Sequence, residues 1–278
     1  MTPERFHLRF WGVRGTVPTP FPDRLRYGGN TPCAAVDLGD DAFLVLDAGT
    51  GLRVMGHELL QAGRRKKLRF DIFLSHYHFD HLEGLSLFPA LYEAGCQIRV
   101  HGASTLNRNV GDVLRALVAP PYFPVALMGA PAGVEFHTLN GQPVQVGGLT
   151  VGTLPLRHPD GSTAFRLQHP GGRLVFATDH EHGDAVVDRS LVEFARDAAV
   201  LVYDATYEPA EYEEMRRGWG HSTWYAAVQT ALAAKVRRLV LFHHHPEHTD
   251  EQLDEIQRLA RNEFPDTDVA REGMEVAF

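Results

Sequence analysis

The densest group of chemically reactive side chains in the sequence lies in the segment His76-Tyr-His78-Phe-Asp80-His81. Three imidazoles and one carboxylate fall within these six residues, directly after the nearly continuous apolar run 69–75. His76 and His78 can point from a turn to one cation, while Asp80 and His81 can point to a second. Imidazole and carboxylate ligands suit Zn²⁺, and they also suit Mn²⁺ or Fe. The pattern predicts a metal site, because a merely solvated histidine-rich turn has no reason to follow an apolar strand.

Two neighbouring cations of this kind have a well-defined chemistry. Held about 3.5–4 Å apart, they can share a bridging hydroxide and polarise a phosphoryl or carbonyl oxygen. A bound metal lowers the pKa of its water to roughly 7, so hydroxide is present near neutral pH. The predicted reaction class is metal-dependent hydrolysis.

Composition disfavours several other classes of protein. The 27 Lys and Arg residues against 35 Asp and Glu residues give a formal net charge of −8, which opposes a non-specific grip on long nucleic acid. No run of about 18 apolar residues and no apolar stretch behind a basic start occurs, so we expect neither a membrane span nor a secretory signal. Only Cys33 and Cys96 are present, and we expect both to be reduced in a cytoplasmic protein.

The elements that position the motif follow from hydrophobic periodicity and turn residues. We expect strands over 6–13, 34–38, 42–47, 69–75, 98–101, 200–203 and 239–242, and a strand-dominated region over 134–176. Helices are expected over 188–196 and 222–235, and helical spacing appears at Leu82, Leu85 and Tyr92. Thr249 and Gln252 form a capping-box pattern that opens a last helix.

Two stretches read as less regular. The basic run 64–67 is interpreted as a solvated turn, and the stretch 107–129 as a loop that either caps a site or packs on the surface. No linker-like change of composition divides the chain. We therefore predict one layered α/β domain over residues 1–278.

The motif His76-x-His78-x-Asp80-His81 resembles the signature of the metallo-β-lactamase superfamily. The resemblance implies a four-layer αββα sandwich with the metals at one edge of the two sheets. It also implies that the aspartate at the position of Asp47 supports the metal loop by hydrogen bonding without binding metal.

Further ligands implied by the resemblance come from later strand ends. His158 corresponds to the third histidine of the first metal, Asp179 to the bridging aspartate and His243 to the histidine of the second metal. Other histidines compete for these places: His169, His180, His182, His244 and His245. A carboxylate bridges two cations better than an imidazole, and His243 is the first residue beyond an apolar strand. We expect His169, in a hairpin turn, to be exposed.

Two later segments favour phosphodiester chemistry. Asp204 ends an apolar strand, and His221 stands in Gly-Trp-Gly-His-Ser-Thr before a helix. The pair resembles the acid and the Gly-His-Ser-Thr segment of ribonuclease Z and related phosphodiesterases. In that group the acid is usually glutamate, so the shorter Asp204 reaches His221 only if the backbone compensates. The simpler interpretation is a helix-capping Ser222 beside an incidental histidine.

The resemblance assigns roles to these groups. His221 would donate to a phosphate oxygen or protonate the leaving group, Asp204 would orient His221, and Asp80 would act in catalysis as well as in metal binding. The position of Asp179 is cysteine in the true β-lactamases, and that of His78 is a carboxylate in flavodiiron oxygen reductases, so both branches are disfavoured. Thioesterases and lactonases of the glyoxalase II type keep the same ligands.

The amino-terminal pattern Phe10-Trp-Gly-Val-Arg14-Gly-Thr, with Arg26-Tyr-Gly-Gly-Asn30, resembles a bacterial group of metallo-hydrolases near ribonuclease Z and the cyclic-phosphate phosphodiesterases. Arg14 can be interpreted as a phosphate contact or as a structural surface arginine. It is therefore not included among the predicted site residues.

The predicted function is hydrolysis of a small or cyclic phosphodiester by a metal-bridging hydroxide, with two divalent ions that we expect to be Zn²⁺. The main alternative is a transfer-RNA 3′-processing endoribonuclease, but the long basic arm of ribonuclease Z has no counterpart in this sequence. A thioesterase, a lactonase and a diiron sensor module are further alternatives. Relatives often dimerise, so a homodimer is compatible with the resemblance.

Overall fold

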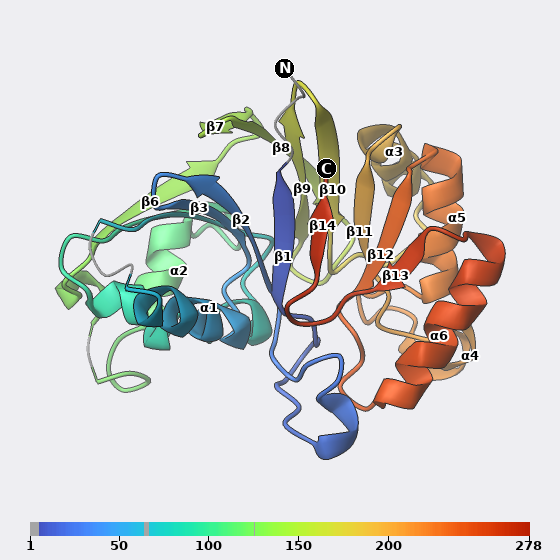
Figure 1. Ribbon diagram of the computed structural model, residues 1–278, viewed down its shortest axis with the longest axis horizontal. Coiled ribbons are helices and arrows are strands. Elements are labelled where there is room, and N and C mark those ends of the chain that lie inside the picture. Colours follow the sequence, from blue (N-terminus) through green and yellow to red (C-terminus); the bar gives the residue numbers. More distant parts are fainter. Residues whose placement is uncertain (1–5, 64–66, 125) are drawn as a thin grey trace.

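The computed structural model describes residues 6–63, 67–124 and 126–278. These residues form two seven-stranded sheets, with the orders β14-β1-β2-β3-β4-β5-β6 and β13-β12-β11-β10-β9-β8-β7 (Figure 1). The strands of the first sheet are β1 His7–Gly12, β2 Cys33–Gly39, β3 Ala42–Leu46, β4 Arg69–Leu74, β5 Gln97–Ala103, β6 Gly133–Leu139 and β14 Glu275–Ala277. Those of the second are β7 Val144–Val146, β8 Leu149–Leu156, β9 Ser162–His169, β10 Gly172–Ala177, β11 Val200–Asp204, β12 Arg238–Phe242 and β13 Thr267–Val269.

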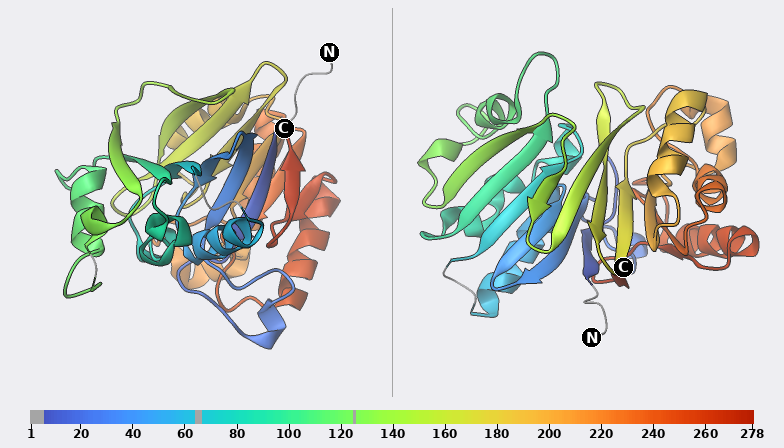
Figure 2. Two further views of the ribbon diagram at one scale, coloured as in Figure 1. Left: turned by 60° about the vertical axis from the view of Figure 1, so that its left-hand side comes forward. Right: turned by 90° about the horizontal axis from the view of Figure 1, so that it is seen from above.

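Helices cover the outer face of each sheet. Their bounds are α1 Thr50–Gln61, α2 Val110–Leu117, α3 Ala185–Ala195, α4 Pro209–Glu211, α5 Trp224–Ala234 and α6 Asp250–Glu263. α1 and α2 lie on one side of the molecule, and α3, α5 and α6 on the opposite side, with both sheets between them (Figures 1 and 2). A π-helical turn over Tyr212–Arg216 follows α4 directly.

Three buried apolar clusters hold the layers together. One joins the inner faces of the two sheets, where the Phe10 and Phe242 rings lie 5.7 Å apart and the Phe73 and Phe165 rings 5.6 Å apart. The other two lie between each sheet and its own helices. Strands β4, β11 and β12 are buried on both faces, which explains their nearly continuous apolar sequences. The structure thus confirms the predicted four-layer αββα sandwich.

The predicted helical stretch around Leu82 to Tyr92 is wrong. It forms short 3₁₀ turns at Phe79–His81, Leu85–Leu87 and Pro89–Tyr92. Pro89 has no N–H to donate and disfavours helical backbone at the residue before it, and Phe88 is accordingly extended with ψ 114°. The apolar spacing serves to bury side chains beneath α1 without a regular helix.

Helix boundaries elsewhere follow their capping residues. The stretch 107–129, predicted as loop, contains α2, where the Asn109 side chain accepts a hydrogen bond from Asp112 N. α3 begins earlier than predicted because the Asp184 side chain caps Val186 and Val187. The predicted capping box at Thr249 opens α6 as expected.

Three remaining sequence predictions concern the surface and the cysteines. Residues 64–66 of the basic run lie outside the described residues. Cys33 and Cys96 are both free and buried. Among the described residues, no helix is both long and apolar enough to cross a bilayer.

Candidate metal centre

Most of the predicted site residues follow the ends of parallel strands; His158, after the antiparallel strand β8, and His221, before α5, are the exceptions. β3 is parallel to β4, and β10, β11 and β12 are parallel to one another, so their carboxyl ends meet at common sheet edges. Asp47, Asp179 and His243 follow such strand ends with φ angles of 61°, 55° and 63°. This left-handed conformation is uncommon outside glycine and concentrates at functional sites. It occurs here at three strand ends: His243 and Asp179 approach each other to 3.4 Å, and Asp47 contacts His81, which also contacts Asp179.

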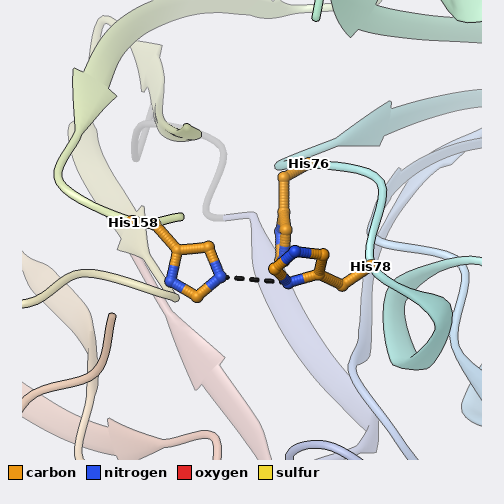
Figure 3. A group of neighbouring side chains, drawn as sticks. All are labelled: His76, His78 and His158. Atoms are coloured by element: carbon orange, nitrogen blue, oxygen red, sulfur yellow. Dashed lines mark hydrogen bonds between the residues drawn. The ribbon is translucent and has the colours of Figure 1, made fainter. Parts of the chain in front are cut away.

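His76, His78 and His158 form the first cluster, in which the three rings face one another (Figure 3). His158 Nε2 lies 3.1 Å from His78 Nδ1, and the His76 and His78 ring centres are 4.5 Å apart. His76 and His78 come from the loop after β4, whereas His158 comes from the loop after β8. The first cluster therefore joins the two sheets.

Asp80, His81 and His243 form the second cluster. His243 Nε2 lies 3.2 Å from Asp80 Oδ2 and 3.4 Å from His81 Nε2. Asp179 lies between the clusters: its Oδ2 is 3.2 Å from His81 Nε2, and its Oδ1 is 3.7 Å from both His76 Nε2 and His158 Nε2. The seven side chains predicted as metal ligands thus lie together, with Asp179 between the two clusters.

The second cluster is supported by buried side chains. His81 Nδ1 donates to Asp47 Oδ2 at 2.9 Å, and Asp47 also accepts hydrogen bonds from Ser75 N and Oγ. His243 Nδ1 lies 3.0 Å from Thr206 Oγ1, which in turn donates to Asp204 Oδ1 at 2.9 Å. The predicted supporting role of Asp47 is in keeping with these contacts. These partners at Nδ1 favour the tautomer of His81 and His243 with the proton on Nδ1, which leaves the Nε2 lone pair for a cation.

The first cluster is supported by a hydroxyl and a backbone carbonyl. His76 Nδ1 lies 3.0 Å from Ser75 Oγ, and His158 Nδ1 donates to Gly220 O at 2.7 Å. A Cβ on Gly220 would lie 2.4 Å from His158 Nδ1, and its φ is +91°, so this approach requires glycine.

Glu181 organises the loop that carries Gly220, and the sequence reasoning missed it. Its buried carboxylate accepts hydrogen bonds from Gly218 N at 2.7 Å, Gly220 N at 2.9 Å and the Tyr212 hydroxyl at 3.0 Å. Its signal in the sequence is an acid two residues after Asp179, between His180 and His182. Through Gly220, Glu181 fixes the ring of His158.

The donor set fits a pair of divalent cations. His76 Nε2 is fully buried and has no hydrogen-bond partner among the described residues, as expected for a nitrogen that binds a metal. Burial and His81 lower the pKa of His76 well below its ordinary value, so this imidazole is neutral. Burial opposes ionisation of Asp179, but His243 and His81 hold its pKa well below the ordinary value. Neutral imidazoles and ionised carboxylates are the forms that bind Zn²⁺ and similar ions.

Asp204 reaches His221 despite its short side chain. Asp204 Oδ2 accepts from His221 Nδ1 at 2.8 Å and from Asp179 N at 3.0 Å. Its Oδ1 accepts from Thr206 N and Ser222 N, both at 3.1 Å. These bonds bring three loops together at the Asp204 carboxylate. This backbone arrangement lets the aspartate, which is shorter than the usual glutamate, reach His221.

The competing histidines lie outside the two clusters. His244 Nε2 donates to Ala270 O, and His180 Nε2 contacts Asp188. His169 was expected to be exposed, and this is wrong: it is 8% exposed, with Nε2 donating to Phe278 O at 3.0 Å. His169 is the last residue of β9 and is covered by Phe278, which follows β14, a contact that the local sequence does not reveal.

Arg14 has a structural role, as one of the two sequence interpretations held, but it is buried and not on the surface. It is fully buried and donates to the carbonyl oxygens of Gly28, Arg24, His245 and His248. Since its donors face these carbonyls and the buried Asp250 carboxylate, 3.7 Å from Nη2, none is left for a phosphate. Arg14 instead ties the amino-terminal loop to the segment after His243, beside Gly15, where a Cβ would lie 2.3 Å from the His243 ring.

Comparison with known proteins agrees with this architecture. The family described as beta-lactamase superfamily domain matches residues 43–244. Ribonuclease Z of Nostoc sp. is 27% identical over 311 aligned positions, covering 96% of this chain and 93% of that protein. The metallo-β-lactamase fold protein YhfI of Bacillus subtilis superposes with a TM-score of 0.71 at 17% identity, covering 99% and 100% of the two chains.

A diphosphatase of the PhnP family superposes with a TM-score of 0.70 at 17% identity, covering 98% of each chain. These two structural likenesses concern the fold. The family match, by contrast, extends from Phe43 in β3 to the residue after His243, and so includes every predicted site residue. On that match the chain belongs to the beta-lactamase superfamily, as a hydrolase of the metallo-β-lactamase fold.

Proposed function

We propose that the protein is a dinuclear metal-dependent phosphodiesterase that hydrolyses a small or cyclic phosphodiester. The residues that would hold the cations are His76, His78 and His158 for one, Asp80, His81 and His243 for the other, and Asp179 for both. When bound, two such ions would supply Lewis-acid polarisation of a phosphoryl oxygen and a water of lowered pKa. Zn²⁺ suits these nitrogen and oxygen donors best.

His221 carries the proposal for phosphodiesters. Its ring stacks on that of His243 at 4.9 Å, and its Nδ1 lies 3.8 Å from Asp179 Oδ1, so it stands at the edge of the centre. Burial lowers the pKa of His221, but Asp204 more than offsets this and raises the pKa to about 9. At neutral pH the imidazolium can therefore donate a proton from Nε2, which has no hydrogen-bond partner among the described residues.

A proton donor in this position serves an alkoxide leaving group or a charged phosphate oxygen. Asp204 fixes the orientation of the ring and stabilises its charged form. Asp80, the remaining predicted catalytic residue, accepts a hydrogen bond from Thr16 N at 2.7 Å, which fixes its carboxylate toward His243. The similarity to ribonuclease Z and to the diphosphatase of the PhnP family supports phosphate ester chemistry.

The second candidate is cleavage of precursor transfer RNA. The ribonuclease Z of Nostoc is similar over nearly the whole length of both chains, which favours it. The net charge of −8 opposes it, because a long RNA draws much of its affinity from neutralised phosphates. A precursor-RNA cleavage assay beside a screen of cyclic nucleotides and dinucleotides, with Zn²⁺- and Mn²⁺-loaded protein, separates the two.

Replacement of His221 by Ala tests the proposal. Turnover of bis(p-nitrophenyl) phosphate should fall by ~10²-fold or more, because a general acid contributes at least that much, while the metal content stays unchanged. His137→Ala is a matched control, since the His137 ring stacks on His101 at 5.0 Å as His221 stacks on His243, and it belongs to neither cluster. Unchanged turnover in His221→Ala would refute the assignment.

A further inference from the structure

The loop that follows β1 contains a strained turn at Gly15, Thr16 and Val17. Val17 N donates to Gly15 O at 2.7 Å, so the three residues form a γ-turn, and Thr16 at its centre has a φ of 68°. A γ-turn with a positive φ is rare and strained. For a β-branched residue such as threonine a positive φ is an outlier, whereas glycine adopts it at little cost. Strain of this kind persists only where the surrounding structure fixes it, and it concentrates at active sites.

Two contacts fix this turn against the second cluster. Thr16 N donates to Asp80 Oδ2 at 2.7 Å. The same carboxylate oxygen lies 3.2 Å from His243 Nε2 and 3.4 Å from His81 Nε2. Gly15 packs on the His243 ring so closely that a Cβ at this position would lie 2.3 Å from it. Thr16 is therefore separated from the imidazoles of the second cluster by a single carboxylate oxygen.

The side chain of Thr16 takes no part in these contacts. Its backbone N–H makes the bond to Asp80, and a glycine would make the same bond with less strain. Thr16 is exposed, and its hydroxyl has no hydrogen-bond partner among the described residues. Thr206, which also lies beside His243, is by contrast buried, and its hydroxyl donates to Asp204. The hydroxyl of Thr16 is thus free to bind a group from outside the chain, next to the second cluster.

The turn and His221 contact the same imidazole. His221 stacks on the His243 ring at 4.9 Å, and Gly15 packs against that ring from the amino-terminal loop. A phosphate that lies at the second cluster and accepts from His221 therefore has the Thr16 hydroxyl as a neighbouring donor. Phosphate oxygens only accept hydrogen bonds, and a hydroxyl can turn its proton toward them. A hydrogen bond to such a charged acceptor is stronger than one between neutral groups.

We propose that Thr16 is a substrate-binding residue, whose hydroxyl donates a hydrogen bond to a phosphoryl oxygen of the substrate on the side of the second cluster. The inference rests on the proposed phosphodiesterase function and adds a second protein donor to that of His221. It also accounts for the strained threonine, because a glycine would relieve the strain but could not supply the hydroxyl.

Thr16→Val removes the hydroxyl and keeps the shape and β-branching of the side chain. Binding of inorganic phosphate to the Zn²⁺-loaded protein, measured by calorimetry, should weaken about tenfold, because a hydrogen bond to a charged group is lost. The kcat/KM for bis(p-nitrophenyl) phosphate should fall by a similar factor. Thr16→Ser, which restores a hydroxyl, should recover most of both. The variants keep the backbone N–H that bonds Asp80, so the metal content should not change.

Thr16→Gly separates a role in binding from a role in stability. It relieves the strain of the turn, so the melting temperature should rise by about 2 °C, while phosphate binding should weaken as in Thr16→Val. A residue with a purely structural role would lose stability and binding together. Lys67→Gly is the matched control, because Lys67 also has a positive φ, of 72°, and lies before β4, at the end opposite to His76. It should raise the melting temperature similarly and leave phosphate binding and turnover unchanged.

Phosphate binding in Thr16→Val equal to that of the wild type would overturn the inference. A loss of metal in Thr16→Val, or a lower melting temperature in Thr16→Gly, would overturn it as well, since Thr16 would then only support the fold around Asp80. Failure of the proposed function looks different: the wild type does not turn over bis(p-nitrophenyl) phosphate, while phosphate binding in calorimetry still depends on the Thr16 hydroxyl.

Discussion

The two histidine clusters of the centre differ in what lies behind their ligands. In the second cluster, His81 is backed by the buried carboxylate of Asp47, and His243 is backed by Thr206 and through it by Asp204. In the first cluster, His76 is backed by a serine hydroxyl and His158 by a backbone carbonyl. Among the described residues, the His78 side chain has a hydrogen-bond contact with His158, a member of the same cluster, and with no residue behind it.

This difference bears on metal affinity. A carboxylate behind a ligating imidazole fixes its tautomer and increases its basicity, and it usually strengthens binding more than a neutral acceptor does. The second cluster should therefore hold its cation more tightly than the first. The first cluster, in turn, is coupled through Gly220 to the loop of His221, so its geometry should respond to changes in that loop.

The largest effect is expected at Asp179, which the two clusters share. Asp179→Asn removes the charge that faces His76, His81, His158 and His243, so both cations should be lost. Turnover of bis(p-nitrophenyl) phosphate should fall to the level of protein stripped with chelator, and elemental analysis should find neither ion. Asp71→Asn is the control, because Asp71 is equally buried and accepts from His101 and Arg99 far from the clusters. Retention of one full equivalent of metal would show that Asp179 serves a single cluster.

Asp47→Asn should weaken metal binding at the second cluster and leave metal binding at the first unchanged. The amide still accepts one hydrogen bond, but it cannot charge-stabilise His81, so affinity at the second cluster should fall roughly 10–100-fold. Competition with a chromophoric chelator resolves the two binding steps, and only the tighter step should weaken. If only the weaker binding step shifted, the second cluster would be the one with the lower metal affinity, which contradicts the proposed order. The control Asp71→Asn should shift neither step.

The local sequence was sufficient to predict the ligands that lie together in one segment, but not the ligands that are distant in the chain. His76, His78, Asp80 and His81 lie together in the chain, and the strand before them shows its two-sided burial as an apolar run. The distant ligands were placed by a family resemblance and by their positions after apolar strands, and the structure brings them together. Such predictions are possible because the ends of parallel strands meet at one edge of a sheet.

The supporting residues could not be predicted in this way. Glu181 acts on backbone N–H groups of a loop more than 30 residues away, and nothing in its own surroundings reveals those donors. The burial of Arg14 likewise depends on carbonyls of His245 and His248, at the other end of the chain. The left-handed backbone at His243 is a third case, because a non-glycine residue gives no sign of a positive φ.

Glu181→Gln should have the smallest effect of the series, and it tests whether the first cluster depends on the loop of His221. A glutamine has one acceptor oxygen, and its NH₂ group would face the N–H of Gly218 or Gly220, so one of these donors loses its partner. The loss of a buried hydrogen bond loosens the support of His158 and displaces His221. We expect kcat for bis(p-nitrophenyl) phosphate to fall by up to about tenfold, with the weaker metal-binding step weakened and the tighter step unchanged.

Glu211→Gln is the matched control on the same segment. Glu211 also accepts from a backbone N–H, that of Glu208, and from His248, but it supports no member of either cluster. Restoration of the weaker metal-binding step by Glu181→Asp, which keeps two acceptor oxygens, would identify acceptor number as the cause. Equal losses in Glu181→Gln and Glu211→Gln would instead mean that the segment contributes only general stability, and that the first cluster is independent of the loop that carries His221.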